Sequence, residues 1–494
     1  MIRPLAPFTA TLSEAAQLIG AESTNHSELV FHGVAIRDSD VEPGDLFVAI
    51  PGSKVHGATY SGNAKSRGAV AVITDRAGAA MVTGLPTLVV GDVRLAAALI
   101  AASFYNYPTR DLSSIAITGT NGKTTVSTLL FQIFESAHRD TGLIGTIETR
   151  IGADILKSSR TTPEAPDLQG LAAVMRERHM RHLVMEVSSH AIALKRIKGS
   201  YFDVAAFTNL TQDHLDFHND MESYFLAKAQ LFTSEYAGKS IINIDSRYGQ
   251  RLATLATTDV ATVSRLNKDA DWHFTQIDKT STGAELRMRG PGGILLESRT
   301  QLFGGYNLDN ILLAVAIAVD SGIDPIELAV IIPTLIGAPG RLDPVELGQD
   351  FKAFVDYAHT PDAVSNVLAA AREFTAGRII AVLGCGGDRD ATKRSLMGQA
   401  LFEGTDIAIF TSDNPRSENP TAILNQMTED ISFSSPSTII EDRSEAISYA
   451  ISQARPEDTV LVLGKGHESG QEVSGKTSAF DDRIHLARAI EGLS

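Results

Sequence analysis

At 494 residues, the chain is long enough for about three domains of roughly 150 residues each. Its formal net charge of −16, with no Lys/Arg cluster, argues against nucleic acid or an anionic membrane as a partner. The single cysteine, Cys385, excludes an internal disulfide and fits a reducing cytoplasm. The N-terminus has no signal-peptide core, and the apolar run 311–319 is too short to span a bilayer. We therefore expect an acidic cytoplasmic protein, without membrane insertion, that concentrates positive charge in a cleft if it binds phosphates.

The chain divides into three α/β segments. The first predicts strands at 46–50, 69–73 and 87–90, a helix over 94–105, and a proline-containing linker at 107–110. From residue 115, apolar strands alternate with helical segments, which predicts a mostly parallel sheet with helices on both faces. Glycines and proline at 337–340 indicate a boundary, and a third unit follows. The strands expected in these two units lie at 115–117, 182–185, 204–207 and 240–244, and then at 351–355, 378–383, 407–411 and 459–463.

The segment Gly119-Thr120-Asn121-Gly122-Lys123-Thr124-Thr125 carries the strongest chemical signal. It joins a strand to a helix over 126–134, the context that a phosphate-binding loop requires. Backbone N–H groups and the helix N-terminus attract phosphate oxygens. Lys123 can reach the terminal phosphates, and the Thr124 hydroxyl can ligate Mg²⁺. A chance glycine-rich turn is the weaker alternative, so we expect ATP binding.

Acidic and imidazole groups follow neighbouring strands. Glu186 ends a strand, where an NTPase places its Mg²⁺ carboxylate; a polar strand end is the weaker alternative, because a phosphate loop lies in the same domain. The run 209–218 holds two histidines and two aspartates, and a neutral imidazole at His214 could bind a metal. For any single histidine of this run, a surface or capping role is an equal alternative. Lys228 lies among apolar residues at helical spacing, where either burial or snorkelling is possible; sequence alone favours snorkelling. Thr161 and Thr162 could hold a substrate or cap a helix.

The third unit offers loops rich in glycine and charge. Residues 384–390 follow a strand but do not form a dinucleotide fingerprint, because Arg389 replaces the last glycine. Cys385 has no base beside it and is interpreted as a small loop residue. The turn 413–416 carries Arg416, which with Arg389 would make two rigid forks suited to a carboxylate. Residues 464–468 follow the predicted strand 459–463; they combine a flexible glycine-containing backbone with an acid, Glu468.

Taken together, these motifs resemble the Mur ligases of bacterial peptidoglycan synthesis. The resemblance covers essentially the whole chain, because the family's motifs occur in family order. They are GTNGKTT, TTPE, MEVSSHA, NLTQDHLDFH, DYAHTPD, GCGGDRD, DNPR and GKGHE.

The resemblance implies an α/β fold of three domains: an N-terminal uridine-nucleotide domain (1–110), a central P-loop doubly wound ATPase domain (111–341) and a C-terminal Rossmann-like amino-acid domain (342–494). It implies that Lys123, His214 and Lys228 are catalytic and that two Mg²⁺ ions assist ATP. By position, the implied ligand contacts are Ser39, Thr161, Thr162, Ser188 and Arg196 for the UDP-linked substrate; Gly119 to Thr125, Asn307, Arg341 and Asp356 for ATP; Thr124, Glu186, His214 and carbamylated Lys228 for metal; and Arg389, Asp413, Asn414, Pro415, Arg416, Gly464 and Glu468 for the amino acid.

The implied reaction is ATP-driven ligation of meso-diaminopimelate to UDP-N-acetylmuramoyl-L-alanyl-D-glutamate through an acyl phosphate, by a monomer. DNPR is the family's usual mark for diaminopimelate, and Arg416 could bind its distal carboxylate, which lysine lacks. Ligation of L-lysine or ornithine, a folylpolyglutamate synthase-like ligase and a P-loop switch or motor are the alternatives. Two positions depart from the family: Asp40 where arginine is usual, and Gly305 where arginine or a similar residue is frequent.

Overall fold

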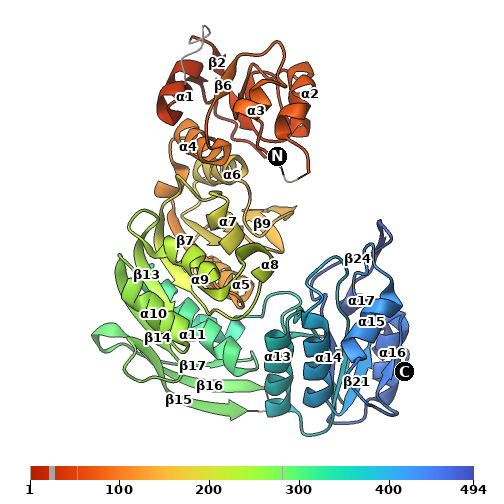
Figure 1. Ribbon diagram of the computed structural model, residues 1–494. Coiled ribbons are helices and arrows are strands. Elements are labelled where there is room, and N and C mark those ends of the chain that lie inside the picture. Colours follow the sequence, from red (N-terminus) through yellow and green to blue (C-terminus); the bar gives the residue numbers. More distant parts are fainter. Residues whose placement is uncertain (1, 22–27, 53, 281, 494) are drawn as a thin grey trace.

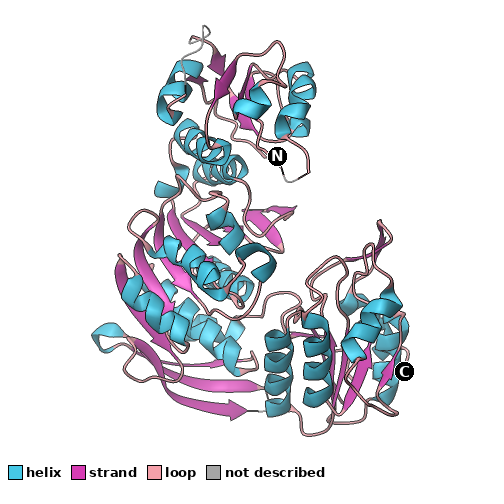
Figure 2. Ribbon diagram, in the orientation of Figure 1, coloured by secondary structure: helices cyan, strands magenta, loops and turns pink. Residues whose placement is uncertain are grey.

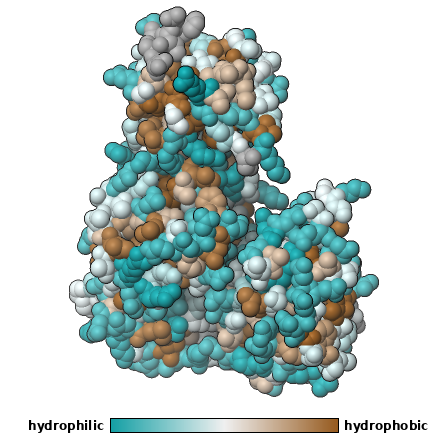
Figure 3. Space-filling view, viewed as in Figure 1, coloured by the Kyte–Doolittle hydropathy of each residue, from teal (hydrophilic) through white to brown (hydrophobic). Residues whose placement is uncertain are grey.

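The computed structural model describes residues 2–21, 28–52, 54–280 and 282–493. Within them, three α/β units follow one another along the chain (Figure 1). The N-terminal unit stands above the central one, and the C-terminal unit lies beside the central one; the space-filling view shows the same arrangement (Figure 3). Among the described residues, no helix has the length and apolar character needed to cross a membrane.

The N-terminal unit has a four-stranded parallel sheet in the order β3-β4-β5-β6. Residues of its helix α4 (Val93–Phe104) and Ala173 of helix α6 (Ala165–Glu177) in the central unit belong to one hydrophobic core, so the two units share packing. The predicted strands and the helix over 94–105 are confirmed within a few residues. The elements are β1 (Ala10–Thr11), α1 (Leu12–Ile19), β2 (Val30–Phe31), β3 (Gly33–Ala35), β4 (Asp45–Val48), α2 (Ser61–Ser66), β5 (Ala71–Thr74), α3 (Arg76–Ala79), β6 (Thr87–Val89) and α4 (Val93–Phe104).

The central unit is built on an eleven-stranded sheet in the order β10-β9-β8-β11-β7-β12-β13-β14-β15-β16-β17. The strands from β8 to β15 run parallel, and helices cover both faces, as predicted (Figure 2). The strands are β7 (Ser113–Thr118), β8 (Thr141–Ile144), β9 (Glu148–Ile151), β10 (Asp154–Lys157), β11 (His182–Glu186), β12 (Phe202–Phe207), β13 (Ala237–Asn243), β14 (Asp259–Ser264), β15 (Trp272–Thr280), β16 (Gly283–Arg289) and β17 (Leu295–Thr300). The helices are α5 (Lys123–Ser136), α6 (Ala165–Glu177), α7 (Ser189–Ala193), α8 (Leu215–His218), α9 (Met221–Ala229), α10 (Arg247–Leu255), α11 (Gly305–Asp320) and α12 (Pro325–Ile331).

Strand β7 lies between β11 and β12, and the chain passes from β7 to β8 in one half of the sheet but from β12 to β13 in the other half. Ligands of open α/β sheets bind at the carboxyl ends of strands around such a position. The antiparallel strands β9, β10, β16 and β17 were not foreseen, although the buried alternation Ala284, Leu286, Met288 is typical of a half-buried strand. The apolar run 311–319 belongs to α11, and residues 311–318 of it are buried, as expected.

The C-terminal unit has a six-stranded sheet in the order β18-β19-β23-β20-β21-β22, parallel except for β18, with a separate hairpin β24–β25. All four strands predicted here are present. The elements are β18 (Asp343–Pro344), β19 (Lys352–Asp356), α13 (Pro361–Phe374), β20 (Ile379–Leu383), α14 (Lys393–Gly404), β21 (Ile407–Phe410), α15 (Pro420–Thr428), β22 (Thr438–Ile439), α16 (Arg443–Gln453), β23 (Thr459–Leu463), β24 (Gly470–Val473), β25 (Lys476–Ala479) and α17 (Asp482–Glu491).

The connection between the last two units is fixed to helix α5. The side-chain amide of Gln132 accepts a hydrogen bond from the Ile336 N–H (2.9 Å) and donates one to the Ile336 carbonyl (3.0 Å). The helix that begins at the phosphate loop therefore also holds the segment leading to the C-terminal unit.

Candidate functional site

The segment between β7 and α5 has the geometry of a phosphate loop. Gly119 (φ +152°) and Gly122 (φ +86°) adopt backbone conformations that favour glycine. A Cβ at Gly119 would lie 1.9 Å from Oγ1 of Thr208, and one at Gly122 would lie 2.4 Å from Oδ1 of Asn310. Both glycines are thus required by backbone conformation and by close packing, which leaves the loop N–H groups room to surround an anion.

Lys123 folds back over this loop. Its Nζ donates to the carbonyls of Gly119 (3.0 Å) and Thr120 (2.9 Å). Burial lowers the pKa of Lys123, and the nearby carboxylates of Glu186 and Asp213 counteract that shift. The ammonium therefore lies where a terminal phosphate could replace backbone carbonyls as its partner.

Asn209 fixes the loop from the neighbouring strand, a role that the sequence did not reveal. Its Oδ1 accepts the Asn121 N–H (2.9 Å), and its Nδ2 donates to the Asn121 carbonyl (3.1 Å). The Asn209 carbonyl also accepts the Thr120 N–H (2.9 Å). Its position just after β12 was the only available signal, because the partner is 88 residues away.

Glu186 is a buried carboxylate at the end of β11 with several donors around it. Its Oε2 accepts the hydroxyls of Thr124 (3.0 Å) and Thr146 (2.9 Å), and its Oε1 accepts the Thr146 N–H (2.8 Å). The parallel register pairs Glu186 with Ile117, so the carboxylate lies beside the phosphate loop. The sequence placed Glu186 and Thr124 correctly at one strand edge but did not identify Thr146.

The predicted contacts of the UDP-linked substrate meet on the other side of Glu186. The Thr162 hydroxyl donates to the Glu186 carbonyl (2.9 Å) and accepts the Ser188 N–H (3.1 Å). Thr161 lies beside Thr146, at 3.1 Å between hydroxyls. Arg196 donates to the Thr162 carbonyl (3.2 Å).

His214 lies at the N-terminus of α8, close to a carboxylate and a second imidazole. Its Nε2 is 3.3 Å from Asp213 Oδ2, and its ring centroid is 4.7 Å from that of His190. Burial lowers the pKa of His214 to about 4, against the attraction of Asp213. The imidazole is therefore neutral at physiological pH, the state in which it can ligate a metal.

Lys228 is buried, so the snorkelling interpretation is wrong. Its Nζ donates to the Gly119 carbonyl (2.9 Å) and lies 4.7 Å from the centre of the Tyr224 ring. Within the described ranges, no carboxylate forms an ion pair with it. Burial and the charge of Lys123 bring the pKa of Lys228 well below its usual value, which favours the neutral amine. A neutral amine is the form that reacts with CO₂ to give a carbamate.

The residues present fit Mg²⁺ only in company with a nucleotide. Among the described residues, no three His, Cys, Asp or Glu side chains form a metal-binding group. Mg²⁺ is commonly held by one or two carboxylates together with substrate phosphates and water. The Glu186–Thr124 pair beside the phosphate loop matches that donor set.

The expected ATP contacts beyond the loop approach it from two units. The Asn310 side chain, which contacts Gly122, donates to Asn307 Oδ1 (3.4 Å). The Arg341 guanidinium lies 4.5 Å from the centre of the Tyr357 ring and depresses the pKa of Lys123 electrostatically.

Asp356 is buried and accepts the N–H groups of Leu342 (2.6 Å) and Ala358 (2.7 Å), so it also orders the connection into the C-terminal unit.

Both departures from the family pattern have an arginine nearby. A Cβ at Gly305 would lie 3.2 Å from the Arg265 guanidinium carbon, so an arginine from elsewhere in the chain covers this position. At the other site, Arg37 is ion-paired with both Asp40 and Asp167. The exposed Ser39 lies beside this group.

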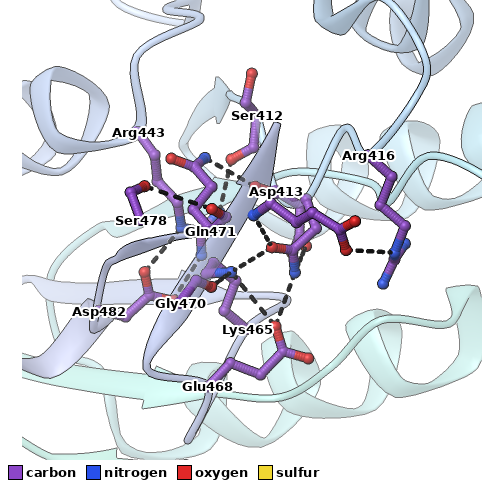
Figure 4. Close-up of polar contacts among 12 residues, drawn as sticks. Ser412, Asp413, Arg416, Arg443, Lys465, Glu468, Gly470, Gln471, Ser478 and Asp482 are labelled. Carbon is purple, nitrogen blue, oxygen red and sulfur yellow. Dashed lines mark hydrogen bonds and ion pairs between the residues drawn. The ribbon is translucent and has the colours of Figure 1, made fainter. Parts of the chain in front are cut away.

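The predicted amino-acid site converges in the C-terminal unit. Asn414 donates to Glu468 Oε2 (2.8 Å) and to Asp413 Oδ1 (3.0 Å). Lys465, which the sequence did not single out, is fully buried and donates to Asn414 Oδ1 (3.2 Å) and the Gly470 carbonyl (2.8 Å) (Figure 4). A Cβ at Gly464 would lie 2.8 Å from Asp413 Oδ2, which explains glycine there.

The two arginines of this site lie close to one glycine. A Cβ at Gly386 would be 2.9 Å from Arg416 Nη1 and 3.8 Å from Arg389 Cγ. The Pro415 carbonyl packs against Gly387. Within the described part of the chain, the exposed Arg389 side chain has no hydrogen bond or ion pair. The Arg416 guanidinium and the aliphatic part of the Arg389 side chain therefore lie near the same glycine.

Cys385 is buried beside Met397, and burial raises the pKa of its thiol to about 12, so it remains a protonated packing residue.

Comparison with family models decides the family. The Mur ligase family catalytic-domain model matches residues 30–105, the Mur ligase middle domain matches 117–318, and the Mur ligase glutamate ligase domain matches 340–466. The chain belongs to the Mur ligase family.

Its relatives among curated proteins share most of its length. A UDP-N-acetylmuramoyl-L-alanyl-D-glutamate--2,6-diaminopimelate ligase of Streptomyces coelicolor is 46% identical, covering 99% of this chain and 98% of its own. The ligase of the same name from Corynebacterium glutamicum is 41% identical, covering 97% and 95%.

A solved structure of a ligase with that name has a TM-score of 0.70 at 32% identity, covering 98% and 99%. Mycobacterium tuberculosis folylpolyglutamate synthase, at 19% identity and a TM-score of 0.60 over 75% of this chain and 92% of its own, shares the fold alone.

Proposed function

We propose that this Mur ligase joins meso-diaminopimelate to the glutamate carboxylate of UDP-N-acetylmuramoyl-L-alanyl-D-glutamate, at the expense of ATP, in peptidoglycan precursor synthesis. One observation supports the proposal most directly. Thr124 of the phosphate loop donates a hydrogen bond to the Glu186 carboxylate, and Thr162 of the predicted acceptor site donates one to the Glu186 backbone carbonyl. A γ-phosphate and an acceptor carboxylate held by these groups would be neighbours. Relatives that share 41–46% of the sequence bear the name of this reaction.

In this mechanism, the phosphate loop and Lys123 hold the γ-phosphate in line with the incoming carboxylate. The carboxylate oxygen attacks phosphorus and ADP leaves, giving an acyl phosphate. The amine of diaminopimelate then attacks the carbonyl, loses a proton, and expels phosphate from the tetrahedral intermediate. Two Mg²⁺ ions, for which Thr124, Glu186, His214 and carbamylated Lys228 are the proposed ligands, would neutralise charge on the phosphoryl oxygens. Positioning and charge neutralisation are the protein's main contributions.

The three units divide the substrates among themselves. We assign the UDP-linked substrate to residues 1–110 with Ser39, Thr161, Thr162, Ser188 and Arg196, and ATP to 111–341. We assign the amino acid to 342–494, and we expect a monomer working in the bacterial cytoplasm. Asn307, Arg341 and Asp356 complete the ATP site at the boundary between the last two units.

Product analysis by mass spectrometry tests the proposal. The expected product is the UDP-muramoyl-tripeptide, formed only when ATP, the UDP-linked dipeptide and meso-diaminopimelate are all present. Phosphate release should require the dipeptide and the amino acid together. Hydrolysis stimulated by a protein partner without an amino acid would indicate a P-loop switch, and glutamate addition to a folate would indicate a folylpolyglutamate synthase.

A further inference from the structure

The hairpin β24–β25 is hydrogen-bonded along the turn that carries Arg416. The Arg416 N–H donates to the Glu472 carbonyl (3.0 Å), and the Glu472 N–H donates to Asn414 Oδ1 (2.9 Å). Gln471 Nε2 donates to the Asp413 carbonyl (2.8 Å), a contact visible in Figure 4. These bonds fix the register of the hairpin against the turn, so the neighbour of Arg416 is set by the fold.

That neighbour is an acid. Glu472 Oε2 lies 3.7 Å from Arg416 Nε, and the two side chains are 43% and 23% exposed. The other end of the guanidinium donates to the Gly387 carbonyl (2.6 Å). Arg416 therefore has a carboxylate of the chain itself beside it while part of both side chains remains open to a ligand.

This arrangement changes the expected selectivity of the amino-acid site. Arg416 alone would reject lysine, because a lysine side chain would leave the guanidinium without an acid. With Glu472 present, Arg416 keeps a counter-charge when the ligand has no distal carboxylate. Glu472 also offers an acceptor to the distal ammonium that both diaminopimelate and lysine carry.

We propose that Glu472 is a specificity-determining residue of this site: its carboxylate accepts the distal ammonium of a diamino acid and repels an amino acid with only a distal carboxylate. The proposal rests on the proposed ligation. It assigns the two charges at the far end of meso-diaminopimelate to two residues, the carboxylate to Arg416 and the ammonium to Glu472. It also makes lysine a weak substrate rather than an excluded one.

Three amino-acid substrates distinguish the effects of the distal carboxylate and the distal ammonium. At saturating ATP and UDP-linked dipeptide, kcat/KM is measured for meso-diaminopimelate, L-lysine (distal ammonium only) and 2-aminopimelate (distal carboxylate only). Glu472→Gln keeps the shape of the side chain and removes its charge. We expect it to lower kcat/KM for lysine at least tenfold and to raise that for 2-aminopimelate at least threefold, mainly through KM. Glu429→Gln, an exposed acid at the end of α15, is the matched control and should move neither.

Opposite changes in kcat/KM for L-lysine and 2-aminopimelate distinguish a charge effect from structural damage, which would lower both values. Parallel loss of both activities, or no change in either, would overturn the assignment. The proposed function fails separately: in that case the unaltered protein gives no tripeptide with meso-diaminopimelate.

Discussion

Replacing Lys228 by methionine separates its chemical role from its packing role. The side chain is buried, with one hydrogen bond, to the Gly119 carbonyl, among the described residues. Methionine preserves the unbranched length and removes the nitrogen. The Gly119 carbonyl is not left unpaired, because Lys123 also donates to it. The direct loss is one hydrogen bond, about 1 kcal/mol.

Removing the ionisable amine has the opposite effect on the free energy of unfolding: it stabilises the folded protein. The pKa of Lys228 is lowered on folding, so the unfolded chain binds more protons and wild-type stability rises with pH. The destabilisation from keeping this lysine neutral grows by up to about 1.4 kcal/mol per pH unit below the usual lysine pKa, until the folded-state pKa is reached. We therefore expect Lys228→Met to gain stability relative to wild type as the pH falls from 9 to 7.

Denaturant unfolding in CO₂-free buffer, where Lys228 is the free amine, measures this difference at pH 9, 8 and 7, with the exposed Lys268→Met as control. In buffer that contains bicarbonate, kcat/KM for ligation should fall at least 100-fold, because the proposed carbamate ligand is absent. A stability difference that does not change with pH would refute the buried, neutral lysine. Activity within threefold of wild type would refute its catalytic role.

Three further predictions concern the phosphate loop, a buried ion pair between helices α16 and α17 of the C-terminal unit, and His214. Gly122→Ala should abolish ATP binding in calorimetry, because its Cβ would lie 2.4 Å from Asn310 Oδ1 on a backbone with φ +86°; unchanged affinity would contradict the loop geometry. Asp482→Asn should lower the free energy of unfolding by about 3–5 kcal/mol, because it leaves Arg443 charged and fully buried; a loss below 1 kcal/mol in denaturant unfolding would count against that ion pair. The His214 ring should stay neutral from pH 8 to 5.5, because its pKa is about 4, and protonation near pH 6.5 in an NMR titration would be inconsistent.

Local sequence patterns were sufficient to predict much of the fold and part of the candidate site. The phosphate loop was predictable because strand, glycines, lysine and helix are contiguous, and Glu186 because it ends a strand. The partners that complete the site are distant in sequence. Thr146 lies 40 residues from Glu186 in the sequence. Arg265 lies 40 residues from Gly305, and its guanidinium occupies the space beside that glycine. No periodicity links such pairs, since the fold brings them together.

Burial and counter-charges were the least predictable properties. Helical spacing left Lys228 either buried or snorkelling, and only the packing of α9 against the phosphate loop decides between them. The charge beside Arg416 depends on the register of a hairpin more than 50 residues away, so composition could not reveal Glu472. Conversely, the antiparallel strand β16 has an alternation of apolar and polar residues that is typical of a half-buried strand.

The central claim is that ATP activates the acceptor's carboxylate inside this site. Its most direct test uses UDP-N-acetylmuramoyl-L-alanyl-D-glutamate with ¹⁸O in the glutamate carboxylate, ATP and meso-diaminopimelate, followed by mass spectrometry of the released phosphate. Because a carboxylate oxygen attacks phosphorus and leaves with it, the phosphate should carry one ¹⁸O for each tripeptide formed. Unlabelled phosphate alongside tripeptide formation would contradict the acyl phosphate.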